Sequence, residues 1–169
     1  MDTEKIKKLT FEQRVQFNAI NLRGAYLDMA CDLEFLLVDI AVVCLVKNSV
    51  ERKNVRDVFM EQNLMSKKIS MAEFALEKYN ATYYEKYKPN FAKFRELNGW
   101  RNKFAHSRIK GDPAGQDLSF IIFEYIKDGK MVEKLEVYQQ FYDKLMDYAK
   151  YLDEMMTGLI PILYTERGL

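Results

Sequence analysis

Residues 10–46 read TFEQRVQFNAINLRGAYLDMACDLEFLLVDIAVVCLV, with apolar side chains recurring at helical spacing. Thr10 and Gln13 form a capping-box pattern, so we expect a helix to begin at this point. The spacing predicts that this helix continues to about Val46. Because nearly every position from Phe35 to Val46 is apolar, that end should be buried on most sides, and a second protein surface could supply part of the burial.

Further helices are expected in the middle of the chain, because only 7 Gly and 3 Pro interrupt its 169 residues. A short helix is expected near Val55–Gln62. Ser70 opens a second capping-box pattern, which predicts a helix from Ser70 to about Tyr87. Pro89 should interrupt this helix, because proline lacks a backbone N–H and clashes with the preceding turn. Another helix is then expected from about Asn90 to His106.

The segment 118–137 differs in composition from the helices on either side. It is rich in β-forming residues, and it contains Asp128-Gly129, a pair typical of a tight turn between two strands. We therefore expect a β-hairpin, preceded by a loop at residues 110–117.

A last helix is expected from about Tyr138 to Met156, ending at Gly158. Together these elements predict an all-α fold, a helical bundle with a β-hairpin appendage near 118–137. Because the chain has the size of one ordinary domain and shows no repeat or flexible linker, a single domain spanning residues 1–169 is expected.

The composition favours a folded protein without a membrane association. The chain is 49% hydrophobic and 30% charged, with a net charge of +1. No secretory signal is visible at the start of the sequence. The most apolar stretch, Phe35–Val46, is too short to span a bilayer and contains Asp39. A protein that coats nucleic acid would be more basic, so any nucleic-acid function should depend on a local site.

Cys31 and Cys44 are expected to be buried free thiols in a reducing, cytoplasmic compartment, since they lie too far apart on one helix to form a disulfide. The sequence shows no His/Cys cluster with zinc spacing, no phosphate-binding glycine loop and no serine triad. We therefore expect no metal and no cofactor.

The only histidine, His106, lies in residues 97–107, which read LNGWRNKFAHS. On a helix, one face of this region carries an apolar stripe of Phe94, Leu97, Trp100, Phe104 and Ala105. Arg101 falls inside that stripe. Asn98, Asn102 and His106 follow one another at intervals of four residues along its flank. A histidine is the usual acid–base group near neutral pH, although a lone histidine can also be purely structural.

Arg101 should be paired, hydrogen-bonded or turned toward a second subunit, because an isolated charge on an apolar face is costly. It could also extend outward into solvent. The fork of a guanidinium is well suited to a phosphate. Asp28, Asp32 and Asp39 follow one flank of the first helix. One of them could hold Arg101 in position, or each could simply be an exposed or capping carboxylate.

The region around the histidine is locally basic, and Glu96 is the only acidic residue among its cations. These cations are Lys93, Arg95, Arg101, Lys103, Arg108 and Lys110. Such a patch fits a phosphodiester partner, and a solvated helix face is the alternative. We assign Lys103, Arg108 and Asn98 as candidate substrate-binding residues, and Asp32 and Asp39 as candidate supporting residues.

Together with the helix order, the phrase from Leu97 to Ser107 resembles the signature of the HEPN superfamily, in which an arginine and a polar residue precede a histidine. The resemblance covers roughly residues 10–156, and only the motif is specific. It implies an all-α fold that pairs two motif helices across a dimer interface, and many members are ribonucleases that need no metal. Some relatives carry a tyrosine two positions after the histidine, where adenylylation neutralises a toxin. Arg108 occupies that position here, so that scheme is in doubt.

The resemblance implies that Arg101, Asn102 and His106 form the catalytic motif. RNA cleavage can use the 2′-hydroxyl as nucleophile, and it then needs a base, an acid and stabilisation of the phosphorane. Since one chain has one imidazole, a homodimer would supply two. We therefore expect a metal-independent endoribonuclease with an RNA substrate and a site shared between two copies. The resemblance also implies a role in toxicity or defence, with a neutralising protein partner.

Two other interpretations stay open. The chain could be a non-catalytic HEPN module that binds RNA, nucleotide or a protein, with Arg101 and His106 serving in packing or ligand contact. It could also be a purely structural helical dimer, in which His106 has no function.

Overall fold

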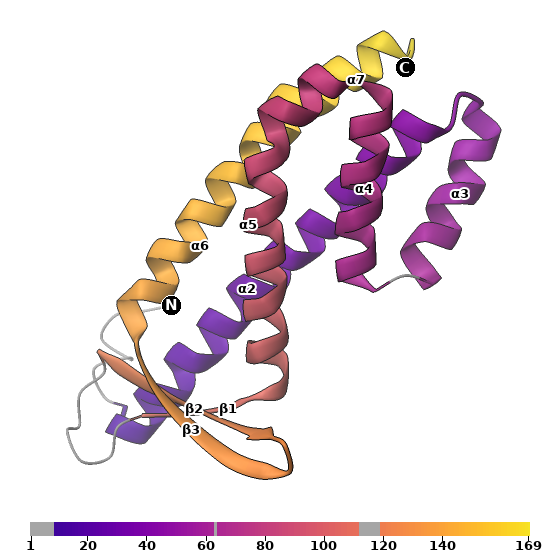
Figure 1. Ribbon diagram of the computed structural model, residues 1–169. Coiled ribbons are helices and arrows are strands. Elements are labelled where there is room, and N and C mark those ends of the chain that lie inside the picture. The colour runs from indigo at the N-terminus through magenta and orange to yellow at the C-terminus, as the bar shows by residue number, and fades with distance from the viewer. Residues whose placement is uncertain (1–8, 63, 112–118) are drawn as a thin grey trace. The chain divides into compact units, whose positions relative to one another are not determined.

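A computed structural model describes residues 9–62, 64–111 and 119–169. The described chain is mostly helical and carries a small antiparallel sheet (Figure 1). The helices are α2 (Phe11–Leu45), α3 (Ser49–Gln62), α4 (Met65–Tyr79), α5 (Ala81–His106), α6 (Tyr138–Asp153), the π-helix η1 (Glu154–Leu159) and α7 (Ile160–Glu166). The strands are β1 (Arg108–Gly111), β2 (Phe120–Lys127) and β3 (Lys130–Val137). The expected helical body and hairpin are confirmed.

The chain divides into two compact units. Unit 1 consists of Met1–Leu27 and Trp100–Met146, and unit 2 consists of Asp28–Gly99 and Asp147–Leu169. The expectation of a single domain stays a prediction. Each unit is described by itself below.

Helix α2 begins and ends as the sequence predicts. The Thr10 backbone N–H donates to the Gln13 side chain at 2.9 Å, and the Gln13 N–H donates to the Thr10 hydroxyl at 3.3 Å. This reciprocal pair is a capping box. At the other end, the Arg52 guanidinium donates to the carbonyl oxygens of Val46 (2.7 Å) and Lys47 (2.8 Å), which follow the last turn of the helix.

The helices between residues 49 and 106 differ from the prediction. Helix α3 is longer than expected, because the Asn48 side chain caps its first turn by accepting the Val50 N–H at 2.8 Å. Ser70 does not open a helix: it lies inside α4 between two buried residues, Ile69 and Ala72. Their burial fixes this segment as helix interior.

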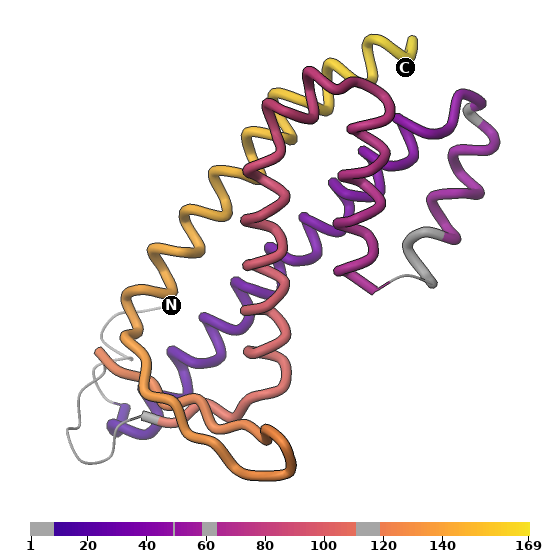
Figure 2. Tube along the Cα trace, viewed as in Figure 1, coloured from indigo at the N-terminus to yellow at the C-terminus, as the bar shows by residue number. Residues whose placement is uncertain are grey.

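The break between α4 and α5 lies at Asn80 and not at Pro89. The Asn80 side chain accepts the N–H groups of Thr82 (3.0 Å) and Tyr83 (3.2 Å), so it caps the first turn of α5. Pro89 lies within α5 and is exposed. The Cα trace of α5 continues as a helix (Figure 2). The helix continues because the buried Tyr87 and Phe91 on either side of the proline anchor both flanking turns.

The last helical segment does not stop at Gly158. It passes through the π-helix η1 and continues in α7 to Glu166, and Gly168 follows with a positive φ of 67°. A Cβ added at Gly158 would lie 2.9 Å from the Tyr87 hydroxyl oxygen. Gly158 is therefore the point where η1 approaches Tyr87 most closely, and it does not end a helix.

The sheet has the order β1-β2-β3, with both pairs antiparallel. The β2–β3 hairpin turns at Asp128 and Gly129, whose φ values of 52° and 74° match the turn type that favours these residues. Strand β1 was not expected: Lys110 and Gly111, predicted as loop, pair with Ile122 and Ile121 of β2. The remainder of the predicted loop, residues 112–117, lies outside the described residues.

Each unit has its own core. Aromatic rings fill the core of unit 1, as described below for the site. Aliphatic and aromatic residues from α2, α4, α5, η1 and α7 fill unit 2, and they include Leu33, Leu37, Ile40, Ile69, Leu76, Phe91, Phe94, Leu97, Met155, Leu159 and Leu163. This second core also encloses Lys68, 1% exposed, which forms an ion pair with Glu34. The pairing compensates for burying the ammonium group.

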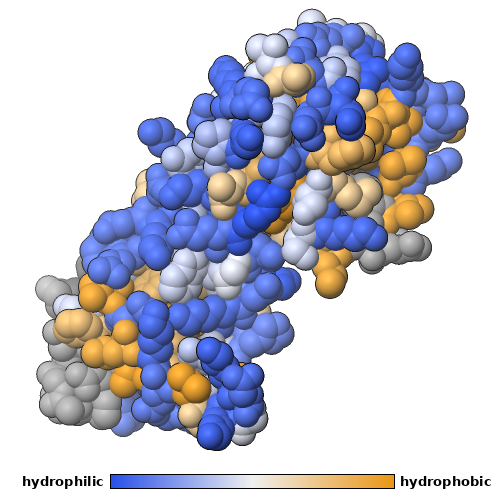
Figure 3. Space-filling view, viewed as in Figure 1, coloured by the Kyte–Doolittle hydropathy of each residue, from blue (hydrophilic) through white to orange (hydrophobic). Residues whose placement is uncertain are grey.

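The surface is mainly hydrophilic on the face shown in Figure 3, with apolar residues in scattered groups. Among the described residues, no helix combines the length and the apolar composition that crossing a bilayer requires. Both cysteines are free, as expected. Cys44 is buried, and burial raises the pKa of its thiol to about 12. The expectation that Cys31 is buried was wrong: it lies on the exposed side of α2.

Candidate active site

The motif occupies the last two turns of α5, within unit 1. Trp100 and Phe104 point into the core, and Phe104 is completely buried. Asn102 and His106 are both exposed. Because residues four apart lie on one face of a helix, these two side chains share the solvent-facing side of the motif. Ala105, predicted in the apolar stripe, is also exposed.

Arg101 is partly exposed and donates a hydrogen bond from Nη1 to Oδ1 of Asn102 at 2.9 Å. Within one chain, the guanidinium is therefore hydrogen-bonded to its neighbour, and a second subunit facing Arg101 stays a prediction. No ion pair to Arg101 occurs within the described residues. Its charge is therefore available for an anionic ligand, and the amide of Asn102 holds one side of the fork.

His106 is the last residue of α5, and its side chain makes no hydrogen bond or ion pair to residues 9–62, 64–111 or 119–169. An acid–base histidine is usually oriented by a second group through one of its ring nitrogens. One chain therefore presents an accessible imidazole without the group that would orient it.

Arg23, from α2, fixes the backbone around His106. Its Nε donates to the carbonyl oxygen of Phe104 at 2.9 Å, and its Nη2 donates to the carbonyl oxygen of Ser107 at 2.8 Å. The last carbonyls of a helix have no partner within the helix. Here one guanidinium satisfies the Phe104 carbonyl in the last turn and the Ser107 carbonyl just beyond the helix, on either side of the histidine. Arg23 thus closes the end of α5 that carries the motif.

An aromatic cluster holds the buried side of the motif. The Phe104 ring lies 4.5 Å from Tyr26, 5.1 Å from Phe123 and 5.6 Å from Phe141, measured between ring centroids. Trp100 lies 5.0 Å from Phe141 in an edge-on arrangement. The Tyr26 hydroxyl donates to the Phe141 carbonyl at 3.0 Å. These contacts join α2, α5, β2 and α6 around Phe104, so the motif stands on a rigid base.

Lys103, a candidate substrate-binding residue, is largely committed within the fold. Its Nζ lies 3.3 Å from the Glu136 carboxylate and 4.5 and 4.6 Å from the ring centroids of Trp100 and Phe123. Burial lowers the pKa of Lys103, and the charge and hydrogen bond of Glu136 offset only part of this effect. A role for Lys103 in binding substrate would require it to leave these partners.

The basic patch suggested by the sequence is largely neutralised by carboxylates from elsewhere in the fold. Lys110 pairs with Glu124, and Arg108, which is 75% exposed, lies 3.9 Å from the same carboxylate. In unit 2, Lys93 pairs with Asp147 at 3.1 Å, and Arg95 pairs with Glu73. Arg101 and the outer side of Arg108 are therefore the cations near His106 that stay accessible to a ligand.

The remaining candidates lie in unit 2. Asn98 is partly buried on α5, and Asp32 is exposed on α2. Asp39 forms an ion pair with Arg56 of α3, a partner that the sequence analysis did not consider. Burial raises the pKa of Asp39, against the opposing charge of Arg56 and a hydrogen bond from Tyr164. Asp39 is thus occupied in holding α3, and a supporting role for Asp32 stays a prediction.

The described residues contain no cluster of three or more histidine, cysteine, aspartate or glutamate side chains that could hold a metal ion. Comparison of the chain with protein-family models, with curated proteins and with solved structures finds no match. The functional argument therefore depends on the geometry of the motif.

Proposed function

We propose that this chain is a HEPN-type, metal-independent endoribonuclease that acts as a homodimer. The observation that carries the proposal is the end of α5, where Asn102 and His106 are exposed together and Arg101 donates to Asn102 without a carboxylate partner among the described residues. A guanidinium without an acidic partner, next to an accessible imidazole, fits a phosphodiester.

Each of these groups can take one role in RNA cleavage. The 2′-oxygen of the ribose attacks phosphorus, and the 5′-oxygen of the next nucleotide leaves. One His106 takes the proton from the 2′-hydroxyl, and His106 of the second copy donates a proton to the leaving 5′-oxygen. Arg101 stabilises the charge on the non-bridging oxygens, while Asn102 orients Arg101. The products are a 2′,3′-cyclic phosphate and a 5′-hydroxyl end.

The same geometry supports the proposal that two copies act together. One chain carries one histidine, and that side chain lacks an orienting partner in the described part of its own chain. A twofold axis beside the end of α5 would bring in the second imidazole and the second guanidinium. The resemblance to HEPN proteins further suggests a role in toxicity or defence, with a neutralising protein partner.

The first test is cleavage of RNA by the purified protein in excess chelator. We expect cleavage that survives chelation, leaves cyclic phosphate ends and is lost in His106→Ala. Gln140→Ala, an exposed change on α6, is the matched control and should retain activity. Absence of cleavage at any protein concentration would contradict the proposal.

A second test addresses the shared site. Wild-type and His106→Ala chains are unfolded together and refolded as a one-to-one mixture. If both histidines are needed, only pairs of two wild-type chains are active. Activity then falls to about one quarter of that of the same total amount of wild-type protein. A fall to about one half would show that each chain acts alone.

The absence of an orienting partner for His106 also favours a second candidate, a HEPN module that binds RNA or another partner without turnover. In that case Arg101→Ala would weaken binding of a non-cleavable RNA, and no cyclic phosphate would form. The end-group assay therefore separates the two candidates.

A further inference from the structure

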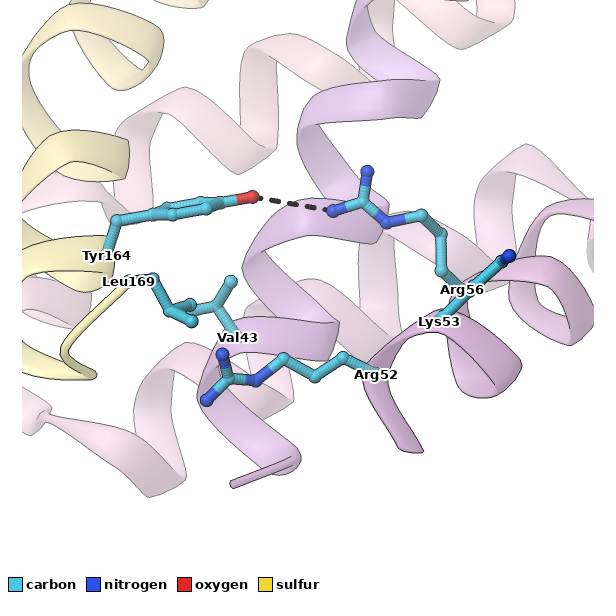
Figure 4. Close-up of a pocket in the computed structure, with 6 residues that line it drawn as sticks. All are labelled: Val43, Arg52, Lys53, Arg56, Tyr164 and Leu169. Atoms are coloured by element: carbon cyan, nitrogen blue, oxygen red, sulfur yellow. Dashed lines mark hydrogen bonds between the residues drawn. The ribbon is translucent and has the colours of Figure 1, made fainter. Parts of the chain in front are cut away.

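Unit 2 contains a pocket that the proposed nuclease does not use. It has a volume of about 260 Å³ and is lined by Val43 of α2, by Arg52, Lys53 and Arg56 of α3, by Tyr164 of α7 and by Leu169 (Figure 4). Ligand pockets usually enclose about 300–1,000 Å³. This pocket lies just below that range, so its ligand should be a small molecule.

The walls of the pocket carry an excess of positive charge. Arg52 and Arg56 are four residues apart and therefore share one face of α3, and the exposed Lys53 adds a third cation. Among the described residues, the Asp39 carboxylate pairs with Arg56. Arg52 and Lys53 have no side-chain carboxylate partner in the same part of the chain.

Both guanidinium groups are held in place before any ligand binds. Arg52 is 9% exposed and donates through Nε and Nη2 to the carbonyl oxygens of Val46 and Lys47. Arg56 contacts Asp39 and the Tyr164 hydroxyl through Nη2, the latter at 3.4 Å. Because a guanidinium has five N–H groups, each arginine retains donors for a ligand. Fixing them in advance lowers the entropy lost on binding.

The rest of the lining is apolar. Figure 4 shows Arg56 directed toward Tyr164, with the side chains of Val43 and Leu169 between the two guanidinium groups in this view. An occupant should therefore have an anionic group for the arginines and an apolar group for this surface.

We propose that this pocket binds a small phosphate monoester whose organic part is apolar. A phosphate monoester carries close to two negative charges near neutral pH, so it can pair with both Arg52 and Lys53, whereas a carboxylate carries one. Its oxygens also accept the paired N–H groups of a guanidinium. The proposal is independent of the nuclease and places the ligand within unit 2.

The test uses phenyl phosphate as the probe, with inorganic phosphate, benzoate and phenol as comparisons. Binding is followed by backbone amide NMR shifts and by calorimetry at low ionic strength. These measurements are made on the Arg101→Ala variant, so that binding of the probe at the α5 motif does not contribute to the signal. Phenyl phosphate should bind saturably and more tightly than each comparison compound, and the shifts should centre on α3 and Tyr164.

Two variants and a control sharpen this test. Arg56→Lys keeps the charge but loses the fork, and it should weaken phenyl phosphate binding about tenfold. Lys53→Gln should weaken it about threefold to tenfold. Lys67→Gln removes one exposed positive charge from α4 and should leave binding unchanged.

Three results would each overturn the proposal. The first is no saturable binding of phenyl phosphate. The second is equal weakening by Lys53→Gln and Lys67→Gln, which would show non-specific attraction. The third is benzoate or phenol binding as tightly as phenyl phosphate, which would remove the reason for choosing a phosphate.

Discussion

The free backbone groups at the two ends of α5 are hydrogen-bonded in different ways, and we call each set of hydrogen bonds a closure. At the start of the helix, in unit 2, the Asn80 side chain caps backbone N–H groups two and three residues away. At its end, in unit 1, Arg23 reaches carbonyl oxygens that are 81 and 84 residues away in sequence. The first closure is local and independent of the rest of the fold. The second exists only when α2 and α5 pack together, so the motif end forms only in the folded unit.

The largest effect should come from the accessible charge at the motif end. Arg101→Ala should lower RNA cleavage by about 10²- to 10³-fold, because it removes stabilisation of charge in the transition state. The free energy of unfolding should change little, since Arg101 is partly exposed. The measurement is the single-turnover rate on a short RNA. Lys130→Ala, which removes an exposed cation from β3, should cleave like the unmodified protein. Equal loss in both variants would mean that net charge, and not this site, drives cleavage.

Removal of the long-range closure should affect both stability and function. Arg23→Ala deletes two charge-assisted hydrogen bonds, so unfolding should become easier by about 1–3 kcal/mol. Since the backbone on both sides of His106 loosens, kcat per folded molecule should fall about tenfold with little change in KM. Denaturant unfolding and steady-state kinetics measure the two effects. The lysine in Arg23→Lys has no guanidinium fork that could reach both carbonyl oxygens. The stability and kcat of this variant should therefore lie between those of the wild type and Arg23→Ala. An unchanged kcat would show that Arg23 has no positioning role.

A change at Gly158 tests how the first part of α5 is anchored. Gly158→Ala places a Cβ 2.9 Å from the Tyr87 hydroxyl, and this crowding should lower the free energy of unfolding by about 1–3 kcal/mol. Tyr87→Phe removes that hydroxyl and leaves the next ring atom at 4.0 Å, so the penalty should be smaller in the double variant. Denaturant unfolding of the four proteins in this cycle gives the coupling. Equal penalties in both backgrounds would contradict the close approach.

Loss of the Asn80 cap at the start of α5 should affect function less than loss of the Arg23 contacts at its end. Asn80→Ala should cost about 1 kcal/mol, as is usual for a lost helix cap, while cleavage per folded molecule stays unchanged. Unfolding and kinetics are measured as for Arg23→Ala. If cleavage falls as far as it does in Arg23→Ala, the two ends of α5 are not independent.

The smallest effect should come from the sheet carboxylates near the motif end. The hydrogen bond from Lys110 lowers the pKa of Glu124, with further contributions from the charges of Lys110 and Arg108. Because the folded pKa lies below the ordinary value of 4.5, the stabilisation is present above pH 4.5 and is lost as pH falls through the folded pKa. Glu124→Gln should therefore be less stable than the wild type near pH 7, and the difference should disappear at acid pH. A difference that persists in acid would exclude this ion pair as its source.

Local signals in the sequence predicted the elements that local interactions determine. The capping box at Thr10 and Gln13 set the start of α2, and Asp128-Gly129 set the hairpin turn. Local signals failed where packing outweighed them. Ser70 has the residue type of a helix start, yet Ile69 and Ala72 are buried beside it, and Gly158 resembles a helix end although it marks a close approach to Tyr87.

For the candidate site, too, the sequence predicted what local spacing determines and missed what depends on long-range contacts. Helical spacing placed Asn102 and His106 along one flank of the helix, and the structure exposes both. It also placed Phe104 in the apolar stripe, and Phe104 is buried. Arg23 was missed because its partners lie in a distant part of the chain, and its one signal was a charged residue next to the buried Leu22. The commitment of Lys103 to Glu136 was invisible for the same reason, since the carboxylate comes from β3.

Trp100 is the single tryptophan of the chain, and it lies one residue before Arg101 within the aromatic cluster. The ammonium groups of Lys103 and Lys144 each lie 4.5 Å from the centre of its ring. All intrinsic indole fluorescence therefore originates from one place beneath the motif. Its emission wavelength and its quenching by iodide or acrylamide can report on local opening at this place without any attached dye.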